Sequence, residues 1–463
     1  MDLEERLIEQ ALAMGASYVG LLRHNVASSV ITAENGALRS YVNGKTSGLG
    51  VRVVVDGGLG IAASTELDSP KLQRRVEYAV KMAKAARGRV EYINFADTQP
   101  LEARWKSKSA KSPDSMSDKD KIVLTMDANK SAMLGSIKNS VTSLAWLEEQ
   151  RIFKSSEGAN VKCELIMTGL AQSCVAKLEG NMEFLSDSRS QCAGFEFISG
   201  GDWCSFSRGV AETSLKAVKA KAPKAGIYRA VADPDLVGLI LHEALGHASE
   251  ADLVTTGESV LDSCLDKEVA SPVVTIVDDG LVDGGYLLPY DDEGVVKKRQ
   301  TIVEKGVLKG FLHSRGTARK MKGSPTGNAR VQSFSDMPIV RQTNFFMEAG
   351  DLSFEELVED VDEGLYICGR GARGGEVDVG LGAFTFRVGP SYIITKGEIG
   401  EMVRGVSISG MILETLKSVD AVARDALVKT SIFGGCGKDG QTARVGYGGP
   451  HVRVGRVTVG GET

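Results

Sequence analysis

Hydrophobic and polar positions alternate along much of the first 200 residues, a pattern typical of β-strands with one buried face. Strands are predicted at 18–22, 28–32, 38–42, 49–55, 59–63, 140–146, 151–156, 161–167 and 194–198. Asn35-Gly36 and Asp56-Gly57 are typical of two-residue hairpin turns between such strands. Helical periodicity predicts helices at 2–15, 71–86, 119–133 and 210–220, and a polar connection runs from Thr98 to Ser117. The first part of the chain is therefore expected to combine a sheet with helices.

From about residue 226 the chain becomes rich in strands and glycine. Strands are predicted at 272–277, 300–304, 307–312, 366–369, 384–388, 392–395 and 452–457, and helices at 353–363 and 409–424. The polar stretch 221–226 is the best boundary between domains, which we place at 1–223 and 224–463. The predicted fold class is α+β: an N-terminal α/β-sheet domain precedes a β-rich, largely antiparallel domain that encloses a functional helix.

Composition narrows the class of protein. A chain of 463 residues exceeds what one hydrophobic core usually supports, in line with two domains. A net charge of −5 without a basic run argues against nucleic-acid binding. The acidic N-terminus and the lack of a long apolar run predict neither a signal peptide nor a membrane span. Seven cysteines without a Cys-x-x-Cys pair fit reduced thiols, so we expect a cytoplasmic protein.

The candidate chemistry lies on a predicted helix that begins at Asp233-Pro234. His242, Glu243 and His247 follow on it, and two imidazoles beside a carboxylate suit zinc with a glutamate as general base. The histidines are five residues apart, which on a straight α-helix would point them about 140° from each other. Gly246 permits a π-type turn or an early helix end, either of which would bring His247 back towards His242.

The alternative is that both histidines are ordinary residues of an amphipathic helix. The chain has only five histidines, and two of them fall within six residues. Burial of Glu243 without a cation or strong hydrogen bonds would cost several kcal/mol. These observations favour a metal site. The isolated His24 is instead predicted to be an ordinary strand residue.

A catalytic zinc site needs a third protein ligand, and several residues could supply it. The candidates are His313, His451, Cys264, Cys368 and Cys436. Cys436 ranks first because glycines on both sides allow a close approach to the metal, and Lys438 could help to lower the pKa of its thiol. The residues alone leave the choice open.

The chain resembles the TldD/PmbA family of cytoplasmic metallopeptidases, on its TldD side. The shared motifs extend over nearly the whole length and include 11–18, 48–53, 242–252, 290–294, 306–310, 325–330, 343–344, 375–378 and 435–441. The resemblance implies that His242, His247 and Cys436 bind Zn²⁺ and that Glu243 is the general base. It also implies pairing with a homologous TldE/PmbA-like chain that lacks the motif, or with a second copy.

The implied activity is hydrolysis of unfolded peptides or small proteins. A peptide could be held by adding a strand to a sheet edge, for which the glycine-rich strands at 374–395 are candidates. Two other functions stay open: a non-catalytic assembly subunit, and a zinc hydrolase of a small molecule such as a deaminase. The His-x-Glu and Pro-Cys-x-x-Cys signature of nucleobase deaminases is missing.

Overall fold

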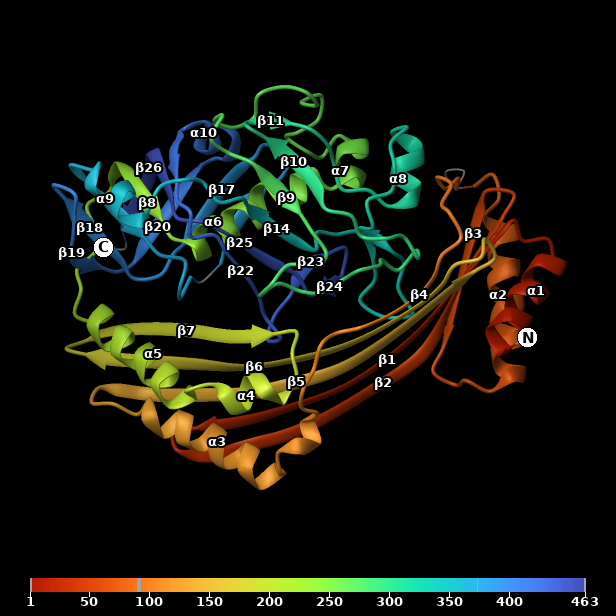
Figure 1. The fold of residues 1–463 in the computed structure, drawn as a ribbon, viewed down its shortest axis with the longest axis horizontal. Coiled ribbons are helices and arrows are strands. Elements are labelled where there is room, and N and C mark those ends of the chain that lie inside the picture. Colours follow the sequence, from red (N-terminus) through yellow and green to blue (C-terminus); the bar gives the residue numbers. More distant parts are fainter. Residues whose placement is uncertain (1, 90–92, 373, 462–463) are drawn as a thin grey trace.

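The computed structural model describes residues 2–89, 93–372 and 374–461. A sheet of long, curved strands supports a second, strand-rich half that lies on its concave side (Figure 1). The mixed α+β class predicted from the sequence is confirmed. The division into domains at 1–223 and 224–463 stays a prediction.

The first half is a seven-stranded sheet in the order β3-β2-β1-β5-β6-β4, with β7 also paired to β6. Its strands are β1 (Tyr18–Glu34), β2 (Ala37–Val55), β3 (Gly58–Ser64), β4 (Glu102–Lys106), β5 (Ile137–Ser155), β6 (Asn160–Leu178) and β7 (Asn181–Gln191). The hairpin turns at Asn35-Gly36 and Asp56-Gly57 are confirmed, with positive φ at all four residues. All pairings are antiparallel except that of β4 with β6.

Helices cover the two ends of the outer face of this sheet. At one end, α1 (Leu3–Ala13) and α2 (Ser69–Ala86) pack on Leu21 and Val51. At the other end, α3 (Asp118–Ser131), α4 (Phe195–Gly200) and α5 (Trp203–Ala217) pack on Ile31 and Trp146, and a 3-10 turn, η1 (Pro113–Ser115), precedes α3. Between the two groups of helices the strands cross an uncovered stretch (Figure 1).

The second half contains two larger sheets. The nine-stranded sheet has the order β16-β17-β20-β26-β8-β15-β18-β19, with β21 also paired to β26. Its strands are β8 (Gly226–Ala232), β15 (Glu363–Ile367), β16 (Gly375–Asp378), β17 (Ala383–Arg387), β18 (Ser391–Thr395), β19 (Glu398–Val403), β20 (Val406–Met411), β21 (Val419–Val422) and β26 (Val452–Gly461). The six-stranded sheet, in the order β11-β10-β9-β14-β25-β22, is made of β9 (Ile276–Asp278), β10 (Gln300–Glu304), β11 (Val307–Leu308), β14 (Asn344–Met347), β22 (Leu427–Thr430) and β25 (Gly446–Gly449).

A broken helix lies between these two sheets and shares one core with both. It runs through α6 (Pro234–Ile240), the π-helical turn η2 (Leu241–Gly246), the 3-10 turn η3 (His247–Ser249) and α7 (Ala251–Thr256). Leu241 and Leu245 pack in a cluster that contains Phe345 of one sheet and Leu365 of the other. The predicted enclosure of this helix in a largely antiparallel β-rich layer is therefore confirmed.

The remaining elements are short. Two two-stranded sheets join β12 (Ala329–Arg330) to β13 (Ile339–Val340), and β23 (Cys436–Lys438) to β24 (Gln441–Ala443). The short helices are α8 (Arg315–Lys320), α9 (Phe354–Glu359) and α10 (Ile412–Lys417). Among the described residues, no helix is both long and apolar enough to span a bilayer.

Three predicted elements were wrong. Residues 194–198, predicted as a strand, form the N-cap and first turns of α4, in which Phe195 packs on Trp146 and Phe197 on Trp203. The helix predicted at 409–424 is only the six-residue α10 between β20 and β21. The polar connection from Thr98 to Ser117 contains β4, which pairs with the edge of β6.

Candidate metal centre

The helix that carries the candidate chemistry begins as predicted. The Asp233 carboxylate accepts hydrogen bonds from the backbone N–H groups of Leu236 and Gly369, each at 2.8 Å, and Pro234 occupies the first turn. The cap thus also fastens the start of α6 to the segment that follows β15. The helix is held at a fixed position between the two sheets.

Of the two arrangements that the five-residue spacing allowed, the π-type turn is present. The His247 N–H donates to the His242 carbonyl, five residues back, at the end of η2. Gln342 stabilises the turn, because its Nε2 donates to the same carbonyl at 3.0 Å. A Cβ at position 246 would overlap the Gln342 amide, so this packing favours glycine, although the backbone there is right-handed helical and open to any residue.

The turn brings together three metal-ligating side chains. One donor atom from each of His242, His247 and Cys436 lies within 4.8 Å of the others, and all three residues are buried. The Cys436 Sγ is 3.0 Å from His247 Nε2. The buried Nδ1 of His242 has no hydrogen-bond partner among the described residues, as expected of an atom that binds a metal. Two imidazoles and a thiolate form a donor set that suits zinc.

The other candidates for the third ligand lie in different surroundings. His313 Nδ1 is 3.2 Å from the Thr317 hydroxyl, and His451 lies between Asp425 and Tyr366. The thiol of Cys264 faces the Val260 carbonyl, and Cys368 is buried next to β15. His24 is a strand residue, as predicted, and its Nε2 is 2.7 Å from Glu149.

The charges of the group favour a thiolate. Burial raises the pKa of Cys436, but hydrogen bonds and charge interactions with His242 and His247 outweigh it and lower this pKa to about 5. Burial lowers the pKa of His247, but Glu250 and Cys436 raise it to about 10. A thiolate is the form of cysteine that binds metals. The role suggested for Lys438 needs correction: its amine contacts Glu250 and Asp252, and the principal lowering of the thiol pKa comes from the histidines.

Glu250 is a part of the site that the sequence reasoning missed. Its side chain is fully buried, and Oε2 lies 3.0 Å from His247 Nδ1, so that the imidazole N–H donates to the carboxylate and leaves Nε2 towards the thiol. Burial raises the pKa of Glu250, but His247 and Lys438 lower it to about 2, which keeps the carboxylate charged. Such carboxylates orient metal-binding histidines and fix their tautomer. Its spacing of three residues from His247 was the available signal.

Glu243 projects differently from the three donor residues. Its side chain is 39% exposed, and its Oε2 is 3.9 Å from His247 Nε2. The carboxylate therefore lies next to the donor group while it remains open to solvent. The Tyr447 ring, with its centroid 6.2 Å from that of His242, lines a neighbouring pocket of about 230 Å³.

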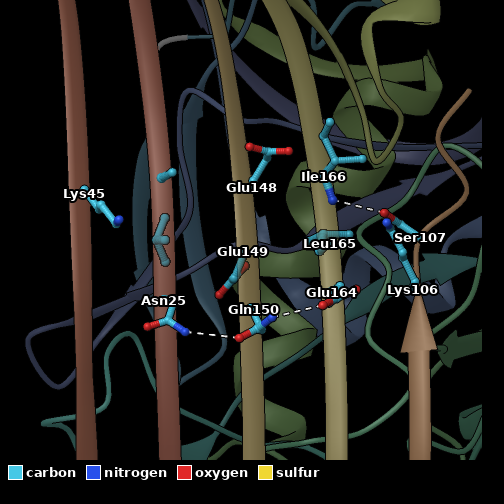
Figure 2. A pocket seen from close by; sticks show the side chains of 12 residues that line it. Asn25, Lys45, Lys106, Ser107, Glu148, Glu149, Gln150, Glu164, Leu165 and Ile166 are labelled. Carbon is cyan, nitrogen blue, oxygen red and sulfur yellow. Dashed lines mark hydrogen bonds between the residues drawn. The ribbon is translucent and has the colours of Figure 1, made fainter. Parts of the chain in front are cut away.

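A second hollow, of about 330 Å³, lies on the uncovered face of the long-stranded sheet (Figure 2). Its polar side chains bond to one another across three strands: Asn25 donates to Gln150 at 3.2 Å, and Gln150 donates to Glu164 at 2.9 Å. None of the three metal-ligating residues lines it. The hollow is therefore separate from the group of His242, His247 and Cys436.

Comparisons with known proteins find metallopeptidase relatives over the whole chain. The profile of the PmbA/TldA metallopeptidase C-terminal domain matches residues 225–461, and that of PmbA/TldA metallopeptidase domain 1 matches residues 22–83. A "Metalloprotease" of Methanothermobacter thermautotrophicus is 37% identical, over 100% of this chain and 97% of its own. A "Zinc metalloprotease TldD homolog" of Saccharolobus solfataricus is 28% identical, over 98% of this chain and 99% of its own.

Solved structures share the fold. TldE from Thermococcus kodakarensis superposes with a TM-score of 0.81 at 17% identity, covering 99% of this chain and 100% of its own. A protein from Thermotoga maritima gives a TM-score of 0.80 at 22% identity, with 99% of both chains covered. At these identities the likeness concerns the fold alone.

Proposed function

The chain belongs to the PmbA/TldA metallopeptidase family, and we propose that it hydrolyses unfolded peptides with a zinc ion held by His242, His247 and Cys436. The observation that carries the proposal is the convergence of these three buried donors: His242 lies in the π-helical turn, His247 directly follows it, and Cys436 lies on a distant hairpin. When bound, zinc supplies a Lewis acid that polarises a peptide carbonyl and acidifies water.

Side chains of the protein orient the metal ligands and transfer the proton. His247 is held by Glu250 with Nε2 directed to the site, and Cys436 is held as a thiolate. Glu243, partly exposed beside the donors, accepts a proton from the attacking water and passes it to the leaving amine.

The edge strand β16 supports binding of an extended peptide. Among the described residues, β16 pairs only with β17, and it lies beside the π-helical turn. Its other edge therefore offers backbone groups to a peptide strand near the π-helical turn. Recognition through backbone hydrogen bonds depends little on side chains, which suits unfolded peptides as substrates.

Glu243→Gln tests the mechanism. The amide is nearly isosteric and the three ligands are untouched, so the variant should bind zinc like the wild type. Peptide hydrolysis should fall by about 10²-fold or more, the scale of losing a general base. Zinc content and the rate of peptide cleavage should be measured on the same preparation. Wild-type cleavage by a zinc-loaded variant would remove Glu243 from the mechanism, and loss of zinc would make it a ligand.

We further propose that the active form is a dimer, with a TldE/PmbA-like chain or with a second copy. The fold shared with TldE and the membership of the family support this pairing. Light scattering and peptidase assays of the chain, alone and with a TldE-like partner, should show higher activity in the paired form. Full activity of a monomer would contradict the proposal.

A further inference from the structure

The hairpin that carries Cys436 is separate from both large sheets. Its strands, β23 and β24, form a two-stranded sheet of their own. Gly434, Gly437 and Gly440 surround the cysteine, and a Cβ at any of them would meet nothing within 4 Å. The two strands pair with each other, but among the described residues they form no ladder with either large sheet, and these three glycines have no close packing around them. Side-chain contacts with the rest of the protein must therefore fix the position of the thiol.

Lys438 provides the contact between this hairpin and the histidine-bearing segment. Its Nζ donates to Glu250 Oε2 at 2.9 Å and to the two Asp252 carboxylate oxygens at 2.7 and 2.8 Å. The lysine side chain is 8% exposed and that of Glu250 is 0% exposed. Ion pairs shielded in this way are screened by salt much less than surface pairs.

Glu250 connects the lysine to the metal group directly. The same oxygen, Oε2, contacts both Lys438 Nζ and His247 Nδ1, at 2.9 and 3.0 Å. One carboxylate oxygen therefore links the hairpin of the cysteine to the imidazole of the histidine. We refer to Lys438, Glu250 and Asp252 as the clamp.

Arg341 holds the hairpin from another side. Its guanidinium donates to the backbone carbonyls of Cys436 and Gln441. These bonds fasten the hairpin to the segment after β13. Among the described residues no hydrogen bond joins Arg341 to the carboxylates of the clamp, although its charge helps to lower the pKa of Glu250. The two sets of contacts are distinct, so removal of Lys438 should loosen the hairpin from the histidines without releasing it from the protein.

We propose that Lys438 is a positioning residue that holds Cys436 against the histidines before the metal arrives and thereby slows the loss of bound metal. The proposal rests on the ligand set of the proposed function. In a site assembled in advance, a departing ion leaves three donors in place to recapture it. In a loosened site the thiolate moves away with its hairpin. Mutation of residues that hydrogen-bond metal ligands typically lowers metal affinity by about 10–100-fold.

The test compares zinc release from full-length variants. Lys438→Met keeps the aliphatic stem and removes the charge, and Lys438→Arg restores a cation. Lys121→Met is the matched control, because Lys121 is also buried and pairs with Asp118 at 3.2 Å, but it lies on α3, away from the clamp. Zinc-loaded proteins are mixed with excess chelator well below their melting temperatures. Lys438→Met should release zinc about 10–100 times faster than the wild type, Lys438→Arg at an intermediate rate, and Lys121→Met at the wild-type rate.

Amide exchange gives a readout that needs no metal. In the metal-free protein, Lys438→Met should exchange the amides of residues 434–443 faster than the wild type, while the amides of β14 and β25 stay unchanged. A folded Lys438→Met protein with wild-type zinc release and wild-type exchange would overturn the clamp. If Lys438→Met does not fold, Asp252→Asn removes one carboxylate of the clamp and should shift both readouts in the same direction by less.

The two proposals can fail separately. If Cys436→Ser retains zinc like the wild type, the ligand assignment fails, and the exchange of residues 434–443 still decides whether Lys438 holds the hairpin. If Cys436→Ser loses zinc but Lys438→Met changes neither readout, the proposed function stands and the clamp does not.

Discussion

At the scale of single residues, the site combines local and distant contributions. His242, Glu243 and His247 lie within one turn of chain, so their spacing alone indicated a metal site. Cys436 is 189 residues away from His247 and forms no recognisable pair with them in the sequence. Its flanking glycines ranked it first among the candidates for the third ligand. The structure then places its Sγ 3.0 Å from His247 Nε2.

Cys436→Ser should therefore abolish tight zinc binding. A serine hydroxyl does not ionise near neutral pH, so the site would keep two imidazoles, and two ligands rarely hold zinc against a chelator. Metal analysis after dialysis should find about one zinc per wild-type chain and much less in the variant. Cys264→Ser is the control, because its thiol faces the Val260 carbonyl away from the group, and it should keep its zinc. An unchanged zinc content in Cys436→Ser would mean that one of the other candidate residues is the third ligand.

At the scale of elements, the π-helical turn was predictable and the length of the strands was not. The five-residue spacing and Gly246 implied η2 from local rules. By contrast, 18–22 and 28–32 were predicted as two strands and form one strand, β1. Residues 38–42 and 49–55 likewise join in β2, because the polar residues between them cross the stretch of sheet that no helix covers. The coverage of a sheet by distant helices cannot be read from the pattern of one strand.

Gly246→Ala tests the packing of the π-helical turn. The backbone at this position is right-handed helical, so alanine is tolerated there, but its Cβ would overlap the Gln342 amide. Overpacking of this kind costs about 1–3 kcal/mol, and displacement of Gln342 removes its hydrogen bond to His242. The free energy of unfolding of the metal-free protein should fall accordingly, and zinc affinity should fall by about tenfold or more.

Gly209→Ala is the matched control for that variant. Gly209 lies inside α5, and a Cβ there would meet nothing within 4 Å. Alanine should stabilise this helix by up to about 1 kcal/mol and leave zinc binding unchanged. Chemical denaturation and zinc titration of both variants check the pair of expectations. Equal effects of the two substitutions would show that the contact with Gln342 is unimportant.

At the scale of the whole molecule, a buried charge network joins the long-stranded sheet to the half that carries the metal centre. Arg151 of β5 contacts Glu149 at 2.7 Å and Asp292 at 2.6 Å, and both carboxylate side chains are about 5% exposed or less. Burial raises the pKa of Glu149, but Arg151 and His24 together hold it well below its usual value. A lowered folded-state pKa contributes stability above the unfolded value of about 4.3, and this stability is lost as the pH falls below it.

Arg151→Met should reverse the pH dependence that this network gives. The variant leaves Glu149 and Asp292 buried without their shared cation, which should lower the free energy of unfolding at pH 7 by about 3–5 kcal/mol. Without the arginine, burial should raise the pKa of the Glu149 carboxyl, so the folded state of the variant binds a proton more readily than the unfolded chain. Its stability should then increase as the pH falls from 7 to 5, whereas that of the wild type should not.

Arg39→Met, which removes an exposed pair with Glu34, is the control and should change stability by less than about 1 kcal/mol at either pH. Urea denaturation of the three proteins at pH 5 and 7 measures the slopes, and parallel slopes for the wild type and Arg151→Met would contradict a stabilising role for this contact between the two halves.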